Sequence, residues 1–113
     1  MQMRSVKLLR CNLHSRNQQW RLTDDGQLMS GEFVIGLSLA TKNSPQQFKI
    51  FKLSKASNVK TLWRYDHHRR LVHEQTGKCM QANPRTKAVT LETCIMRDMQ
   101  TWTLTTREER QAL

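Results

Sequence analysis

Leu62-Trp63-Arg64-Tyr65 opens the stretch of sequence that decides the fold, and Gln100-Thr101-Trp102-Thr103-Leu104 closes it. Between these ends, the segments 69–73, 77–80 and 89–94 carry apolar residues among polar ones and are separated by turn residues. This pattern predicts short β-strands, the first and last of which are marked by a tryptophan.

The tryptophans recur along the whole chain. Trp20 and Trp63 are 43 residues apart, and Trp63 and Trp102 are 39 residues apart. A recurrence at this period indicates a repeat architecture. We therefore expect half of a first copy followed by two whole copies, and short strands at such steady spacing favour a barrel or a sandwich.

The middle copy is expected to differ from the last one in its cysteines. Aligned without a gap, residues 38–53 match residues 79–94, so that Ser38 and Leu53 stand where the last copy has its two cysteines. On this alignment the middle copy has lost a whole bridge.

The three cysteines predict one disulfide and one thiol without a partner. Cys79 and Cys94 flank one predicted hairpin, and neighbouring strands can bring two Cα atoms within bridging distance. Such a bridge would stabilise the fold by about 3 kcal/mol. Cys11 stands at the place corresponding to Cys94, so its partner would precede this chain. The alternative is three unpaired thiols in a cytosolic protein.

Composition predicts a single domain that makes no membrane contact. The chain has 113 residues, of which 37% are hydrophobic, and it holds no apolar run long enough to span a bilayer. The segment 1–10 has basic residues but lacks the apolar centre of a signal peptide. Either the chain starts as a soluble protein does, or the natural N-terminus lies upstream.

The net charge of +10 is unevenly spread. Residues 42–70 contain eight Lys or Arg and one acidic residue, Asp66. A field of this sign attracts polyanions such as sulfated glycans. The alternative is a solvated basic face, and no motif for reading nucleic acid accompanies the charge, so we expect no nucleic-acid partner.

Motifs at the tryptophans resemble those of the ricin B-type lectin family, whose repeats carry Cys-Leu-Asp and then Gln-x-Trp. Gln18-Gln19-Trp20 and Gln100-Thr101-Trp102 match the second motif, Thr61-Leu62-Trp63 keeps its tryptophan, and Cys79-Met80-Gln81 keeps the cysteine and the apolar residue of the first. The resemblance covers residues 5–104.

The resemblance implies an all-β fold, a β-trefoil of three Gln-x-Trp repeats that is incomplete at the N-terminus, with about ten of twelve strands. The single domain 1–113 would then divide into four parts. These are 1–22 as the second half of repeat 1, 23–64 as repeat 2, 65–104 as repeat 3 and 105–113 as a tail.

Within that family, the residues 63–66, 71–73 and 77–79 resemble the C-terminal lectin domain of polypeptide N-acetylgalactosaminyltransferases. This resemblance implies a non-catalytic module that binds GalNAc or galactose, on glycopeptides among other ligands, without a cofactor. The module would target an attached transferase to glycosylated substrates in the Golgi lumen of the secretory pathway, with the catalytic domain outside this chain.

The family's sugar sites use an Asp, an aromatic ring and an Asn, and no copy here keeps all three. The candidate carbohydrate-binding residues are Asn17, Gln18, Phe51 and Gln81. Asn17 could instead be a loop amide that caps backbone groups. The missing Asp residues leave open a structural trefoil with decayed sugar sites, besides polyanion binding through the basic 42–70 surface.

Neither a metal site nor a catalytic centre is predicted. His67 and His68 are adjacent, and adjacent residues of a strand point to opposite faces, so they cannot easily chelate one ion. The sequence offers no pairing of a nucleophile with a base and no Gly-rich phosphate loop, so we expect no enzyme activity from this chain.

Overall fold

The computed structural model describes residues 4–10, 18–43, 45–57 and 59–104. These residues form ten short strands, and none of them lies in an α-helix. The strands are β1 (Arg4–Ser5), β2 (Arg21–Leu22), β3 (Leu28–Ser30), β4 (Phe33–Ser38), β5 (Phe48–Lys52), β6 (Val59–Lys60), β7 (Trp63–Tyr65), β8 (Leu71–His73), β9 (Cys79–Ala82) and β10 (Val89–Glu92). Two 3-10 turns, η2 (Leu53–Lys55) and η3 (Asp98–Gln100), complete the described elements.

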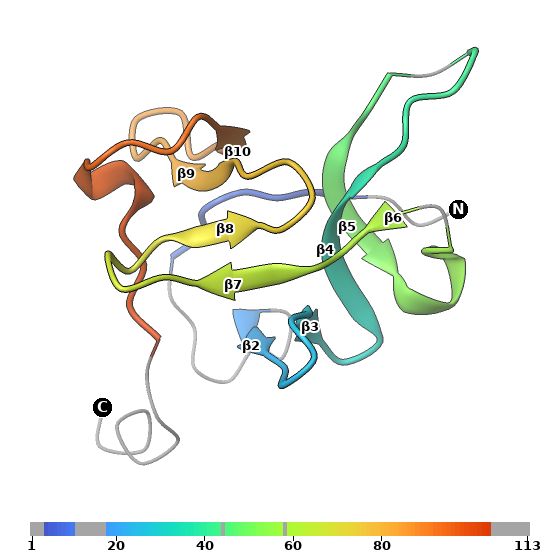
Figure 1. Cartoon of the computed structure of the whole chain (residues 1–113), viewed down its shortest axis with the longest axis horizontal. Helices are drawn as coiled ribbons and strands as arrows, with labels where there is room; N and C mark the ends of the chain where they lie inside the picture. Colours follow the sequence, from blue (N-terminus) through green and yellow to red (C-terminus); the bar gives the residue numbers. More distant parts are fainter. Residues whose placement is uncertain (1–3, 11–17, 44, 58, 105–113) are drawn as a thin grey trace.

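The strands form two antiparallel sheets (Figure 1). The larger sheet has the order β1-β5-β4-β3-β2, with β6 also paired to β4, and the smaller sheet has the order β10-β9-β8-β7. Two isolated bridges, Lys7 with Ala88 and Gln27 with Leu62, join the sheets. The chain is thus all-β, as the tryptophan repeat predicted, and has the trefoil fold that the family resemblance implies.

The internal repeat is visible in the register of the strands. Arg21 pairs with Met29 across β2 and β3, and Arg64 pairs with Val72 across β7 and β8. Each residue of the second pair comes 43 residues after its counterpart in the first pair, which is the spacing between Trp20 and Trp63. The same hairpin is therefore built twice.

The alignment without a gap is wrong, because the middle hairpin is longer than the last one. Cys79 pairs with Val72 on one side and Glu92 on the other. In the middle copy, the residue with the equivalent pairs is Val34, which faces Met29 and Phe51.

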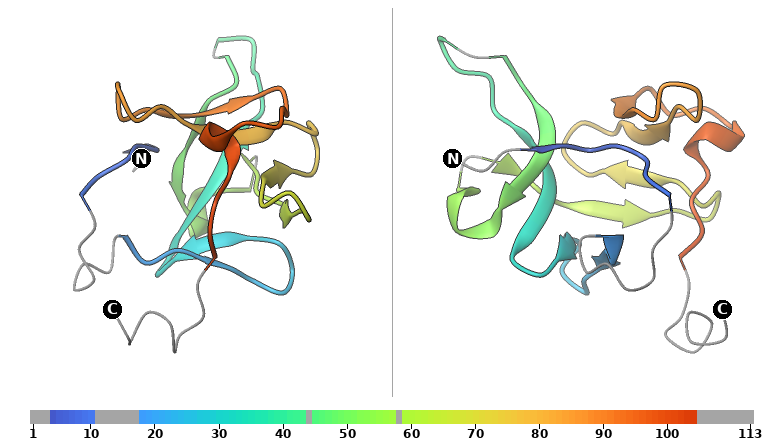
Figure 2. Two further views of the ribbon diagram at one scale, coloured as in Figure 1. Left: turned by 90° about the vertical axis from the view of Figure 1, so that its left-hand side faces the viewer. Right: turned by 180° about the vertical axis from the view of Figure 1, so that it is seen from behind.

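Ser38 and Leu53 are consequently far apart in the β4–β5 hairpin. The amide of Ser38 bonds to the carbonyl of Gln47, whereas the amide of Leu53 bonds to the carbonyl of Glu32 at the opposite end. The extra residues lie between Ser38 and Gln47, and the described parts of this loop, 39–43 and 45–46, protrude from the body of the protein in Figures 1 and 2. Polar loop residues carry no periodic pattern, so the sequence did not reveal the insertion.

The core lies between the two sheets. Its buried cluster consists of Leu28, Ile35, Trp63, Leu71, Met80 and Val89. Trp63 is 2% exposed, and its ring meets that of Phe48 edge-on at 5.9 Å. Trp20 and Trp102 are half-buried and pack against the same cluster. Burial of these apolar surfaces is the main term that stabilises the fold.

Candidate functional site

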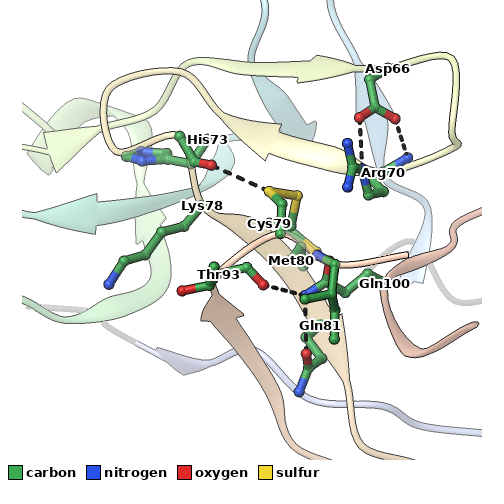
Figure 3. The surroundings of a disulfide bond; sticks show 12 residues. Asp66, Arg70, His73, Lys78, Cys79, Met80, Gln81, Thr93 and Gln100 are labelled. Carbon is green, nitrogen blue, oxygen red and sulfur yellow. Dashed lines mark hydrogen bonds and ion pairs between the residues drawn. A yellow bond between two sulfur atoms is a disulfide. The ribbon is translucent and has the colours of Figure 1, made fainter. Parts of the chain in front are cut away.

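The predicted disulfide between Cys79 and Cys94 is confirmed (Figure 3). The two Cα atoms lie 4.9 Å apart, within the usual range for a disulfide. The bridge fastens the segment after β10 to the start of β9. Cys11, which the sequence predicts to be free, lies outside the described residues.

Gln100 organises the polar groups beside this disulfide. Its side chain is 0% exposed. The amide nitrogen donates to the carbonyl of Thr93 at 2.8 Å and to Oε1 of Gln81 at 3.1 Å, and its oxygen accepts from the amide of Ile95 at 2.8 Å. Because a buried amide must satisfy its hydrogen bonds, Gln100 holds the Gln81 side chain in one orientation.

Gln81 lies on a polar face of the β9–β10 hairpin. It pairs directly with Thr90, and Glu92 follows two residues later on the same strand and therefore on the same face. Gln81 is half-buried, whereas Thr90 and Glu92 are exposed. An amide, a hydroxyl and a carboxylate together can both donate to and accept from the hydroxyls of a sugar. We call Gln81, Thr90 and Glu92 the hairpin site.

The equivalent place in the middle copy is closed. Since Val34 corresponds to Cys79, Gly36 corresponds to Gln81, and Thr61 corresponds to Gln100. A Cβ atom on Gly36 would lie 2.6 Å from Cγ1 of Val59 and 3.0 Å from Cγ2 of Thr61. The residues 59–61 of the same chain therefore fill the space that a polar side chain at position 36 would need.

The structure places the four predicted sugar-binding residues differently. Asn17 lies outside the described residues. Gln18 is half-buried, and its Nε2 donates to the carbonyl of Arg10 at 2.9 Å. Phe51 is 3% exposed, so its ring is in the interior and not on a surface. Gln81 alone of the four belongs to the hairpin site.

The role of Gln100 was not predicted from the sequence, in which this residue figures only as the first member of the Gln-x-Trp motif. The recurrence of Gln at the same place in two of the three motifs was the available signal.

The turn that joins β7 to β8 is held by Asp66. This carboxylate accepts from the backbone amides of His68 and Arg70 and forms an ion pair of 2.8 Å with Nε of Arg70. Burial raises the pKa of Asp66, but these hydrogen bonds and the Arg70 charge outweigh it and hold the pKa below its ordinary value. His67 and His68 are exposed at the tip, and the described residues contain no cluster of three metal-ligating side chains.

The two sheets and the repeated hairpin are those of a β-trefoil. The chain belongs to the family of ricin-type beta-trefoil lectin domains, whose sequence profile matches residues 2–102. Domains of this family are non-catalytic, and membership supports carbohydrate binding. A comparison with curated protein sequences finds no match.

Among solved structures, the chain is similar to GalNAc-T7 in its crystal structure with UDP, GalNAc and Mn2+. The TM-score is 0.69 at 22% sequence identity, and the match covers 91% of this chain and 18% of that chain. The likeness is one of fold. The chain thus spans less than a fifth of the length of GalNAc-T7.

Proposed function

We propose that this domain binds GalNAc or galactose, free or on a glycopeptide, at the hairpin site. The observation that supports this proposal is the hydrogen bond from Gln100 to Gln81. It holds the Gln81 side-chain amide in one orientation on an otherwise exposed polar face, so this side chain loses less conformational entropy when a sugar binds. Glu92, beside it, supplies a carboxylate that can accept two sugar hydroxyls.

The attached protein is proposed to be a polypeptide GalNAc-transferase in the Golgi lumen, which the domain directs to glycosylated substrates. Support comes from the likeness to GalNAc-T7 and from the disulfide, since disulfides persist in the secretory pathway. No helix among the described residues is long and apolar enough to cross a membrane. In repeat 1, Asn17 and Gln18 remain proposed secondary contacts.

Calorimetric titration with GalNAc, galactose and glucose tests the proposal. The variant Gln81→Ala should weaken GalNAc binding about fivefold, the value of one neutral hydrogen bond. It should also lower Tm slightly, because the buried Gln100 amide loses one of its two acceptors and keeps the carbonyl of Thr93. Gln75→Ala, an exposed glutamine in the preceding turn, is the matched control. Absence of binding to GalNAc and galactose by the wild-type chain would instead favour a trefoil whose sugar sites have decayed, as the filled space at Gly36 already indicates for the middle copy.

Polyanion binding through the basic 42–70 surface is the second candidate. Part of that charge is already neutralised, because Lys52, Arg64 and Arg70 form ion pairs with Glu32, Glu74 and Asp66. The dependence of affinity on salt concentration distinguishes the two functions. Binding of a heparin-like chain should weaken steeply between low and high ionic strength, whereas binding of a neutral sugar should hardly change.

A further inference from the structure

A cavity of about 430 Å³ opens between β1, the β4–β5 hairpin and the β9–β10 hairpin. The segment 4–10 runs from β5, with which β1 pairs, to Ala88 just before β10, and its Ser5 and Val6 line the cavity (Figure 2). The volume falls within the range of about 300 to 1,000 Å³ that is usual for small-molecule sites.

The charged groups of the cavity wall are all positive. Lys49 lines it from β5 and Lys78 from the turn between β8 and β9, and no Asp or Glu belongs to the wall as far as the structure describes it. Nζ of Lys49 donates to the hydroxyl of Ser5 at 3.0 Å, and in Figure 3 the Lys78 ammonium extends away from the disulfide. Neither lysine has a carboxylate partner among the ion pairs of the described chain.

The remaining wall suits a sugar ring. Gln46, Thr76 and Thr90 offer amide and hydroxyl groups, while Phe48 and Val89 contribute apolar surface. Polar groups of this kind can bond to ring hydroxyls, and apolar or aromatic surface can cover the C–H face of the ring.

We propose that this cavity binds an acidic saccharide, with Lys49 and Lys78 holding its sulfate or carboxylate group. Two ammonium groups without a carboxylate partner that line one concave, partly open space attract an anion more strongly than the same charges on a flat surface, because less water screens them. The cavity is distinct from the hairpin site. Thr90 borders both, but Gln81 and Glu92 do not line the cavity.

Titration of the chain with galactose 6-sulfate, glucuronate, galactose and inorganic sulfate tests the inference. The double variant Lys49→Gln/Lys78→Gln removes both charges from the cavity. Lys42→Gln/Lys55→Gln removes the same charge from exposed lysines outside it and is the matched control. Lys49→Arg/Lys78→Arg keeps the charge and guards against loss of fold.

The cavity variant should bind galactose 6-sulfate about tenfold more weakly than the wild type, with less than about a twofold change in the control. The arginine variant should retain most of the affinity, and galactose should bind far more weakly than its sulfate. Equal losses in cavity and control variants would show a diffuse field and overturn the proposal. Equal affinities for galactose and galactose 6-sulfate would also overturn it. So would equal affinities for galactose 6-sulfate and inorganic sulfate, because the cavity wall would then contribute nothing to binding of the sugar ring.

This test also separates the cavity from the proposed GalNAc site. Gln81→Ala should leave the affinity for galactose 6-sulfate unchanged while it weakens GalNAc binding. Loss of the sulfated sugar in that variant would assign the ligand to the hairpin site and contradict the cavity proposal. If the Lys49→Gln/Lys78→Gln variant lost GalNAc binding while Gln81→Ala kept it, GalNAc would not bind at the hairpin site.

Discussion

The indole nitrogen of Trp63 donates a hydrogen bond of 2.9 Å to the carbonyl oxygen of Ile35. Trp102 makes the same contact in the last copy, at 3.0 Å from the carbonyl of Met80. Ile35 and Met80 both belong to the buried core cluster. Trp63 and Trp102 therefore each fasten the chain at the end of a repeat to an apolar residue of an earlier strand, by packing and by a hydrogen bond together.

Replacing Trp63 by Phe should destabilise the protein more than replacing Trp102. Trp63→Phe leaves the carbonyl of Ile35 buried without its donor and opens a small cavity, so we expect a loss of about 3 kcal/mol in the free energy of unfolding. Trp102→Phe should cost about 1 kcal/mol, because water can reach this half-buried contact. Guanidinium unfolding measures both, and equal losses would contradict a special role for the buried indole.

Gly36→Ala should destabilise the fold because no room exists for its methyl group. The new Cβ would lie 2.6 Å from Cγ1 of Val59 and 2.8 Å from the carbonyl oxygen of Lys60, so β6 must shift. Overpacking of this kind costs about 1 to 3 kcal/mol.

Gly31→Ala is the control for Gly36→Ala. Gly31 has a φ of +58° but nothing within 4 Å of the added methyl group, so its cost of about 1 kcal/mol reflects backbone strain alone. Thermal unfolding should rank the two variants in that order. A larger loss for the Gly31 variant would show that β6 yields easily.

Removal of the disulfide should lower the stability of the last copy. The double variant Cys79→Ser/Cys94→Ser opens a loop with a sequence separation of 15, for which chain entropy predicts a loss of about 3 kcal/mol. Dithiothreitol should lower the Tm of the wild type and leave that of the double variant unchanged. Cys11→Ser should behave as the wild type does, and a matching loss in this variant would mean that Cys11 also forms a bridge.

The features that could be predicted from the sequence are those with a recurring motif or a clear residue type. The recurring tryptophans predicted repeated short strands, the cysteine pair predicted the disulfide, and the resemblance of these motifs to the ricin B-type lectin family implied the trefoil. The position of Gly36 could not be found that way, because an insertion in a polar loop shifts the alignment without changing any apolar residue. Phe51 is an aromatic residue two positions before the place of the second cysteine, as the family's sugar sites require, but its position in the motif does not reveal whether the ring faces the core or the solvent.

The candidate site was only partly predictable for a related reason. Gln81 occupies the place of the Asp in the Cys-Leu-Asp motif, and the residues of that motif lie on β9. The partner that orients it, Gln100, is 19 residues away in the chain. A contact over that distance depends on how the loop after the disulfide folds back, which the local sequence pattern does not specify.

Stability should fall as the pH drops below neutral, because of His73. The imidazole is 0% exposed. Its Nε2–H donates to the carbonyl of Lys60 at 2.9 Å, and its Nδ1 accepts from the hydroxyl of Thr76 at 2.9 Å, so the neutral ring satisfies both contacts. Burial lowers the pKa of His73 below its ordinary value of 6.5, although the Lys60 carbonyl and the Glu74 charge oppose the shift.

The direction of the pH effect follows from the pH at which the folded and the unfolded protein each bind the proton on His73. The unfolded chain takes it up near pH 6.5 and the folded protein only at lower pH. The contribution of His73 is therefore complete above pH 6.5 and is lost as the pH falls through the folded-state pKa. Between pH 7.5 and 5.0, the Tm of His73→Gln should start lower than that of the wild type and fall less steeply. His67→Gln/His68→Gln, which changes two exposed histidines, should keep the wild-type slope, and an unchanged slope in His73→Gln would assign the pH dependence to another group.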